Sequence, residues 1–228
     1  MPSPTLEEYL ETIYKLSQDG IVKPAQIAES AGVSGPTVTA TLKRLEQQGL
    51  IERTGTDVFL TEAGIVAALG IVRRHRVAER FLVDILGLDW EAAHEDACFL
   101  EHAMSERVLV ALEEYLDNPD VCPHGHPIPT ADGLMAAQTV GHSLADGRIG
   151  ERAKVIRVAE HPLLLGYLGG KGLKPGAMVE VVDRDGIGGV LVLDVDGAAV
   201  TVTMGVAREV IVEPSDIGSN DIGQGDSQ

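Results

Sequence analysis

The stretch PAQIAESAGVSGPTVTATLKRLEQQGLIERTGTDVFL, residues 24–60, decides the fold of the N-terminal third of this chain. A short helix is predicted after Pro24, because proline fits the first turn of a helix, and Gly32 ends it. A second helix is predicted over about 35–48, with Ser34 as its N-cap. Two helices joined by so short a turn have the proportions of a helix-turn-helix.

Two short β-type runs follow, Leu50–Arg53 and Val58–Thr61, and the turn-forming residues 54–57 separate them. This pattern predicts a hairpin, which is the wing of a winged helix-turn-helix. Upstream, apolar residues at helical spacing predict an amphipathic helix over 5–17. We therefore expect a winged helix-turn-helix DNA-binding domain over residues 1–63.

Two long helices with periodic apolar residues are predicted next, over about 62–86 and 91–116. Their apolar stripes are wider than one chain needs, so we expect a helical domain over 64–117 that forms a dimer interface. A purely intramolecular core is the open alternative. Residues 118–152 are rich in Pro, Gly and His, and they predict a linker.

The C-terminal part changes to β-type runs with Gly, Asp and Pro between them, a pattern that predicts a small barrel over 153–214. The runs are Val155–Val158, Val179–Val182, Val190–Val195, Ala199–Met204 and Glu209–Val212. Residues 215–228 are mostly Gly, Ser, Asp and Asn, and they predict a disordered tail. The expected fold class is mainly α with a small β domain.

Composition limits the function classes. Of the 228 residues, 44% are hydrophobic, which is enough for more than one core. The longest apolar run is too short for a membrane span, and no secretory leader is recognisable, so we expect a soluble, cytoplasmic protein with no membrane partner. Cys98 and Cys122 are too few for a disulfide framework.

The net charge of −17 argues at first against a nucleic-acid partner, because Lys and Arg drive phosphate binding. The charge is unevenly distributed, however. Residues 1–75 carry seven Lys and Arg against nine Asp and Glu, whereas residues 76–150 carry four against fourteen. DNA binding is therefore expected to be local to the first third, and the acidic middle is expected to attract cations.

Three predicted helices carry side chains of the types that bind metals. They are His94, Cys98, Glu101 and His102 on one face of the helix predicted over 91–116, His75 and Glu79 four residues apart on the helix before it, and Glu8 and Glu11 on the first helix. A mixed N, O and S donor set suits Mn(II), Fe(II), Co(II), Ni(II) or Zn(II). Because so many polar groups on an apolar helix would be costly to bury without a purpose, the pattern predicts a metal site.

Each element has a simpler interpretation when it is taken alone. A Cys on an apolar helix is often a core residue, and a Glu pair is often a solvated face. Residues 94–98 also come near to the H-E-x-x-H helix of zinc hydrolases, but Cys98 replaces the second His, and a thiolate fills the position that hydrolysis needs open. The nearby Cys122, His124 and His126 fit no standard zinc spacing.

Six stretches match one family in order. They are Tyr9-Leu-Glu-Thr-Ile-Tyr14, Ser34-Gly-Pro-Thr-Val38, Arg74-His-Arg-Val-Ala-Glu-Arg80, His94 to His102, His102-Ala-Met-Ser105 and Gly125-His-Pro-Ile-Pro129. The chain thereby resembles, over nearly its whole length, the diphtheria toxin repressor family of iron- and manganese-dependent regulators. The resemblance implies a homodimeric repressor, not an enzyme, that binds operator DNA when it is loaded with Mn(II) or Fe(II) and controls metal-homeostasis genes.

The resemblance also implies two metal sites. The residues that match the ancillary site are His75, Glu79 and His94, and those that match the primary, activating site are Glu8, Cys98, Glu101 and His102, with Glu11 matching a ligand of manganese-type members. The barrel resembles an SH3-like or FeoA-like domain, in which Glu160 matches a further ancillary ligand, and His161 matches nearly as well. Zn(II), Co(II) or Ni(II) would serve in vitro.

This chain departs from both branches of the family. Iron-type members have Met where Glu8 stands, and manganese-type members have Asp there together with a Glu matching Glu11, but they have Glu in place of Cys98. The chain is a hybrid, for which we expect Mn(II) to activate, with Fe(II) close behind. Ala40 stands where iron-type members have Gln, so the operator sequence cannot be carried over.

The candidate DNA contacts lie on the second helix of the motif and on the wing. Base contacts are expected from Ser34, Pro36, Thr37 and Thr39, and phosphate contacts from Lys43, Arg44 and Arg53. A solvated helix face is the simpler alternative for each basic residue. A metal-independent winged-helix regulator with a small-molecule effector is the competing function, although it leaves the His, Cys and Glu face unexplained.

Overall fold

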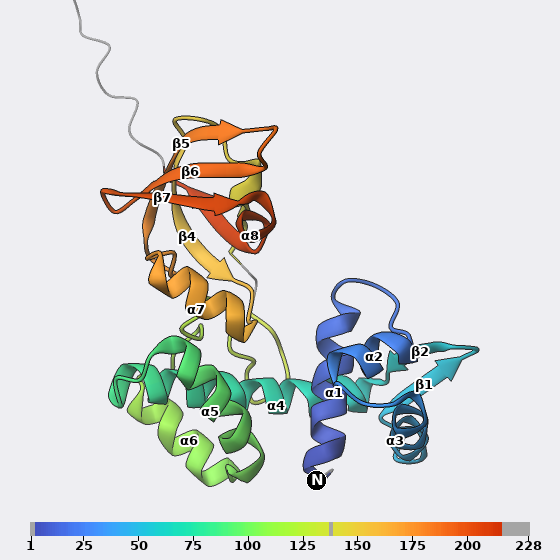
Figure 1. The fold of residues 1–228 in the computed structure, drawn as a ribbon. Helices are drawn as coiled ribbons and strands as arrows, with labels where there is room; N and C mark the ends of the chain where they lie inside the picture. Colours follow the sequence, from blue (N-terminus) through green and yellow to red (C-terminus); the bar gives the residue numbers. More distant parts are fainter. Residues whose placement is uncertain (1–2, 137–138, 216–228) are drawn as a thin grey trace, which may run out of the picture. The chain divides into compact units, whose positions relative to one another are not determined.

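The computed structural model describes residues 3–136 and 139–215, in two compact units divided between residues 137 and 138 (Figure 1). The predicted tail, 216–228, lies outside the described residues, while Ser215 still donates its backbone N–H to the carbonyl of Arg152. Among the helices of the described part, none is both long and apolar enough to cross a bilayer. The domain boundaries inferred inside each unit stay predictions.

The first unit begins with the predicted winged helix-turn-helix. Its elements are α1 (Pro4–Ser17), α2 (Pro24–Ser30), α3 (Gly35–Gln47), β1 (Ile51–Thr54) and β2 (Asp57–Leu60). Prolines open all three helices at the first or second position. Ser34 occupies the N-cap position of α3 as predicted, but its Oγ contacts Thr37 Oγ1 at 2.8 Å instead of capping the backbone.

One apolar core joins these elements. Its buried members include Leu6, Leu10 and Ile13 of α1, Ile27 of α2, Val38, Leu42 and Leu45 of α3, Ile51 and Val58 of the wing, and Ala68 and Ile71 of the next helix. The apolar residues recur three and four positions apart along α1 and α3, which places them on one face of each helix. The position of α1 is therefore fixed by the same core that holds α3, the second helix of the helix-turn-helix.

The helix α4 (Glu62–Arg80) extends from this core to a second apolar core, and a π-helical turn at Phe81–Ile85 follows it. Its first half packs on α1, and Ala78 near its end packs with Ala93 and Ala97 of α5 (Trp90–Ala103). Figure 1 shows α4 running from behind α1 to the α5 and α6 pair. One helix thus belongs to both the predicted DNA-binding part and the part that carries the predicted metal ligands.

The single helix predicted over 91–116 is wrong, because two helices occupy that stretch. Helix α5 ends at Ala103, and α6 runs over Glu106–Tyr115. Met104 and Ser105 are extended between them, and the Ser105 side chain accepts a hydrogen bond from the backbone N–H of Val108. A Ser at an N-cap followed by an acidic first turn is a helix start, and the continuous apolar pattern masked it.

The second unit is an antiparallel six-stranded sheet within residues 139–215, with strand order β3-β8-β4-β5-β6-β7. The strands are β3 (His142–Ser143), β4 (Arg152–Val158), β5 (Met178–Asp185), β6 (Val190–Val195), β7 (Ala198–Thr203) and β8 (Val210–Pro214). Two helices accompany them, α7 (Pro162–Gly170) and α8 (Met204–Arg208). Alternate residues of β6 are buried, and so are Ala153, Val155 and Val158 of β4, where a bulge after Val155 shifts the alternation.

Three details of this unit differ from the expectation. Residues 142–143, predicted as linker, form a strand on β8, and a short 3-10 turn, Leu144–Asp146, follows with Leu144 buried. Helix α7 was not predicted, although Pro162 opens it and Leu165 and Leu168 are buried. Met204, assigned to a strand, begins α8, because Thr203 caps that helix by accepting from the N–H of Val206.

We expect Gly64→Ala to destabilise the first unit. A Cβ at Gly64 would lie 1.9 Å from the carbonyl oxygen of Leu50, a backbone atom that cannot rotate away. Overpacking of this kind costs about 1 to 3 kcal/mol, which urea unfolding of the purified protein would measure. Gly70→Ala in the same helix is the matched control. Since nothing lies within 4 Å of its Cβ, it should raise stability by roughly 0.5 to 1 kcal/mol. Equal effects would contradict the packing argument.

Candidate metal centre

Helix α4 brings two of the predicted ligands into the interior at adjacent turns. His75 and Glu79 stand four residues apart, and their exposed fractions are 2% and 0%. They face α5, which carries His94 one turn before Cys98. Because Ala78, Ala93 and Ala97 are small, α4 and α5 approach closely, and the polar side chains are enclosed between them.

The structure brings together the three residues predicted for the ancillary site, His75, Glu79 and His94. Glu79 Oε1 lies 2.9 Å from His75 Nε2 and 2.8 Å from His94 Nδ1, and the two nitrogens are 3.1 Å apart. Metal–ligand bonds of about 2.1 Å at right angles place neighbouring donor atoms roughly 3.0 Å apart. The three atoms therefore have the spacing of one face of a six-coordinate site. Glu79 Oε2 is buried with no hydrogen-bond partner, which also fits a carboxylate that binds a cation.

Cys122 and His124, which the sequence interpretation set aside, lie beside this group. His124 Nδ1 is 3.2 Å from Glu79 Oε1, and Cys122 Sγ is 3.9 Å from His124 Nδ1. Both side chains are buried, and the His124 ring packs on Trp90. Arg76 and Arg80 of α4 hold the segment in place by donating to the carbonyls of Pro127 and Val121. The irregular segment carries no periodic pattern, so only these tertiary contacts reveal the proximity.

The primary group, Glu8, Glu101 and His102, joins α1 to α5. Glu8 Oε1 lies 2.7 Å from His102 Nε2, and Glu101 Oε1 lies 3.3 Å from the same nitrogen. Glu101 Oε1 is buried and has no hydrogen-bond partner among the residues that the structure describes. The donor atoms of all three residues lie within 4.8 Å of one another, which is close enough to share one ion.

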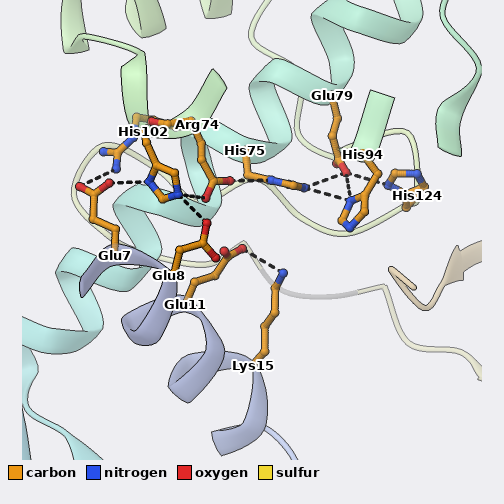
Figure 2. Close-up of polar contacts among 11 residues, drawn as sticks. Glu7, Glu8, Glu11, Lys15, Arg74, His75, Glu79, His94, His102 and His124 are labelled. Carbon is orange, nitrogen blue, oxygen red and sulfur yellow. Dashed lines mark hydrogen bonds and ion pairs between the residues drawn. The ribbon is translucent and has the colours of Figure 1, made fainter. Parts of the chain in front are cut away.

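His75 connects the two groups. Its Nδ1 is 2.6 Å from Glu101 Oε2, while its Nε2 faces Glu79 and His94 (Figure 2). Glu11 lies with His75 and Glu101 in a further cluster, and it also forms an ion pair with Lys15 at 2.9 Å. The donors thus form a continuous chain across α1, α4 and α5.

Cys98 does not join the residues with which it was predicted to act. Its Sγ lies within 4.8 Å of donor atoms of His75 and His94, and it is absent from the cluster of Glu8, Glu101 and His102. The side chain is half-buried and makes no disulfide. Its assignment to the primary site stays a prediction.

The electrostatics of the centre favour the charged forms of His75 and Glu79 despite burial, but not that of Glu101. Burial lowers the pKa of His75, but the charge of Glu79 and hydrogen bonds with Cys98, Glu101 and Glu79 outweigh it, so the pKa lies well above the usual range. Burial raises the pKa of Glu79, and the charge of His75 with hydrogen bonds from three imidazoles brings it well below the usual range. Burial raises the pKa of Glu101. A metal ion binds neutral imidazoles and ionised carboxylates, so it must displace any proton that these side chains carry on their donor atoms. The affinity for metal therefore falls as pH falls.

Glu160 lies in the second unit, between β4 and α7, next to His161, the residue that precedes α7. Its role as a ligand stays a prediction.

The predicted DNA contacts lie on α3 and the wing, where Ser34, Pro36, Thr37, Thr39, Lys43, Arg44 and Arg53 are all exposed. Arg53 donates to Glu46 at 2.6 Å, and Thr39 Oγ1 donates to the carbonyl of Gly35. An ion pair must be broken before Arg53 can contact a phosphate, so we expect Lys43 and Arg44 to contribute more to phosphate binding.

Three family profiles match successive parts of the chain. They are "Iron dependent repressor, N-terminal DNA binding domain" at residues 1–56, "Iron dependent repressor, metal binding and dimerisation domain" at 61–130, and "FeoA domain" at 142–214. The diphtheria toxin repressor of Corynebacterium efficiens is 34% identical over 226 residues, which cover 93% of this chain and 96% of that protein. The chain belongs to the diphtheria toxin repressor family.

Other members of the family are similar over different spans. The iron-dependent repressor IdeR of Mycobacterium tuberculosis is 42% identical over 160 residues, and the matched region spans 69% of this chain and 66% of that protein. A solved manganese-dependent transcriptional repressor in complex with manganese has a TM-score of 0.83 at 32% identity, covering 92% of this chain and all of the other. ScaR with bound Zn²⁺ has a TM-score of 0.78 at 31% identity, covering 91% and 98%. These matches agree with the predicted helical units and FeoA-like domain.

We expect Glu79→Gln to remove part of the metal-binding capacity. The neutral amide would leave two imidazoles without the carboxylate that completes the ancillary group. Fewer Mn(II) or Zn(II) ions per chain should remain bound, and the stabilisation by metal, about 2.7 kcal/mol at 100 times the dissociation constant, should shrink. Metal analysis after gel filtration and thermal unfolding would measure both. Glu95→Gln, on an exposed position of α5, is the control, and unchanged stoichiometry in Glu79→Gln would contradict the ancillary site.

Proposed function

We propose that the chain is a homodimeric transcription repressor that binds operator DNA when it is loaded with Mn(II) or Fe(II). The observation that carries the proposal is the contact between Glu8 of α1 and His102 of α5. Glu8 belongs to a helix of the DNA-binding core, and His102 belongs to the sensing helix. The competing function, a metal-independent regulator, gives this contact no role, and the metal-dependent relatives support the first.

The ligand sets are proposed from the placement of the donor atoms. His75, Glu79 and His94 would hold the ancillary ion, with Cys98, Cys122 and His124 near it, while Glu8, Glu101 and His102 would hold the activating ion, with Glu11 as a further donor. A bound divalent cation supplies positive charge among carboxylates that otherwise repel one another. Both carboxylate oxygens with no hydrogen-bond partner, on Glu79 and Glu101, would gain a ligand bond.

The mechanism is linkage between metal and DNA. Glu8 must stay close to Glu101 and His102 for the primary group to be complete, and α1 is fixed to the helix-turn-helix by Leu6 and Leu10. Closing the group therefore restricts the orientation of α3. A coupling of about 1 to 3 kcal/mol would change operator affinity by roughly 5 to 150-fold, which is enough for a switch.

A second copy of the chain is the expected partner. Apolar side chains of α5 and α6 are exposed, with Phe99 at 78% and Tyr115 at 69%. Phe81, Val108, Leu112 and Tyr115 line an open apolar depression. A dimer would bury these groups and place two recognition helices about 34 to 36 Å apart on successive major grooves. We propose that the chain acts as a repressor and not as an enzyme. Such a repressor would act in the cytoplasm.

We expect metal to raise operator affinity, and His102→Ala to abolish that response. His94→Ala should weaken the response to metal less, because His94 contacts the ancillary group and not the primary one. A His75 variant would be less selective, since His75 contacts both groups. Fluorescence anisotropy on the chain's own promoter DNA, with Mn(II) or with chelator, would measure the affinities. Operator binding that is indifferent to chelator would contradict the proposed function, and equal losses in the two variants would contradict the division into sites.

Glu8→Met should lower Mn(II)-activated DNA binding more than Fe(II)-activated binding. A carboxylate is a hard donor and adds negative charge, so it helps the weakly bound Mn(II) most, whereas a thioether is softer. Anaerobic anisotropy titrations with each metal would give the two shifts. Glu29→Met, at an exposed position of α2, is the control for a lost carboxylate in the same unit. Equal shifts with Mn(II) and Fe(II) would show that Glu8 does not set the metal preference.

A further inference from the structure

Two consecutive glutamates of α1 approach His102 from opposite sides of its ring. Glu7 Oε2 lies 2.8 Å from His102 Nδ1, and Glu8 Oε1 lies 2.7 Å from His102 Nε2 (Figure 2). Their surroundings differ sharply, because the Glu7 side chain is 8% exposed and the Glu8 side chain is 53% exposed. Neither the sequence motifs nor the predicted ligand set gave Glu7 a role.

Both oxygens of Glu7 already have partners. Oε2 faces His102, and Oε1 accepts from Arg74 Nη2 at 3.2 Å. Arg74 is itself buried, and its Nε donates to the carbonyl oxygen of Glu101 at 2.7 Å. Glu7 is therefore held between α4 and α5 and compensated by a cation. A carboxylate so occupied is unsuited to bind a metal, in contrast to Glu101, whose Oε1 has no hydrogen-bond partner.

A neutral imidazole has one nitrogen that donates and one that accepts, and only the second can bind a metal. The ion between Glu8, Glu101 and His102 requires the lone pair on Nε2, the nitrogen that faces both carboxylates. The proton must then remain on Nδ1, where it needs an acceptor. Glu7 Oε2 is that acceptor.

We propose that Glu7 is a positioning residue of the primary metal site. It accepts the Nδ1–H of His102, fixes the ring orientation and its tautomer, and so presents Nε2 to the metal. Arg74 holds the carboxylate in that position and ties it to the backbone of Glu101, the next ligand. The inference rests on the proposed function, since it assigns a role toward the ion that His102 would bind.

Glu7→Ala should lower the affinity of the activating site about 10 to 100-fold, as the loss of such a partner does at other metal sites. Competition with a fluorescent chelator would measure the affinity for Mn(II) and Zn(II). Glu113→Ala is the matched control. Glu113 of α6 forms an ion pair at 2.5 Å with Arg73, the residue before Arg74 in α4, and this similarly buried pair does not contact His102. Its affinity for metal should remain unchanged.

Glu7→Gln distinguishes positioning from a structural role. Arg74 attracts the amide oxygen, so the NH₂ group would face His102 Nδ1 and force the proton onto Nε2. A structural role predicts a milder loss for Gln than for Ala, because the side-chain volume is kept. The positioning role predicts that Gln lowers the metal affinity at least as much as Ala.

The direct readout is the His102 ring in the Zn(II)-loaded, ¹⁵N-labelled protein by NMR. In the wild type we expect a protonated Nδ1 and a metal-bound Nε2, and we expect the Nδ1–H signal to lose its protection from exchange in Glu7→Ala. Metal bound through Nδ1, or an unchanged signal and affinity in Glu7→Ala, would overturn the proposal. A wild-type protein that binds no metal would instead overturn the proposed function.

Discussion

Burial of ionisable side chains between α1, α4 and α5 is the constraint on which the rest of the structure depends. Glu79 and Glu101 are 0% and 1% exposed, and each retains one oxygen without a hydrogen-bond partner. A carboxylate removed from water costs several kcal/mol unless it is compensated by charge and hydrogen bonds. His75 and His94 both approach Oε1 of Glu79, and among the described residues none donates a hydrogen bond to its Oε2. A divalent cation would satisfy both acids, so metal and tertiary structure are coupled.

The coupling reaches DNA because single helices belong to two structures at once. Helix α1 contributes Leu10 to the core of the helix-turn-helix and Glu8 to the primary group. Helix α4 contributes Ile71 to that core, and it carries His75, which contacts Glu101 of the primary group and Glu79 of the ancillary group. The core is closely packed and transmits displacement, so a change in distance at Glu8 cannot be absorbed locally. By linkage, operator DNA must tighten metal binding by the same factor.

The hybrid donor set gives the centre hard and soft ligands in separate places. Carboxylates converge near His102, where a hard cation such as Mn(II) is favoured, whereas Cys98 lies near His75 and His94, and Cys122 lies near His124. Fe(II) and Zn(II) are better suited to that softer surrounding. Metal preference in this repressor therefore depends on which donors meet at each ion.

The sequence by itself determined most of the local elements and most of the candidate ligands. Helical spacing places His75 with Glu79 on one face, and proline and glycine mark the turns of the motif. Contacts between elements needed the tertiary structure. Periodicity could not show that the irregular segment carrying Cys122 and His124 packs against Glu79, nor that α5 ends at Ala103. Nothing in the sequence pattern singled out Glu7. Only the packing of α1 on α4 and α5 encloses it, since burial and hydrogen bonding across elements depend on distances that spacing along one chain does not specify.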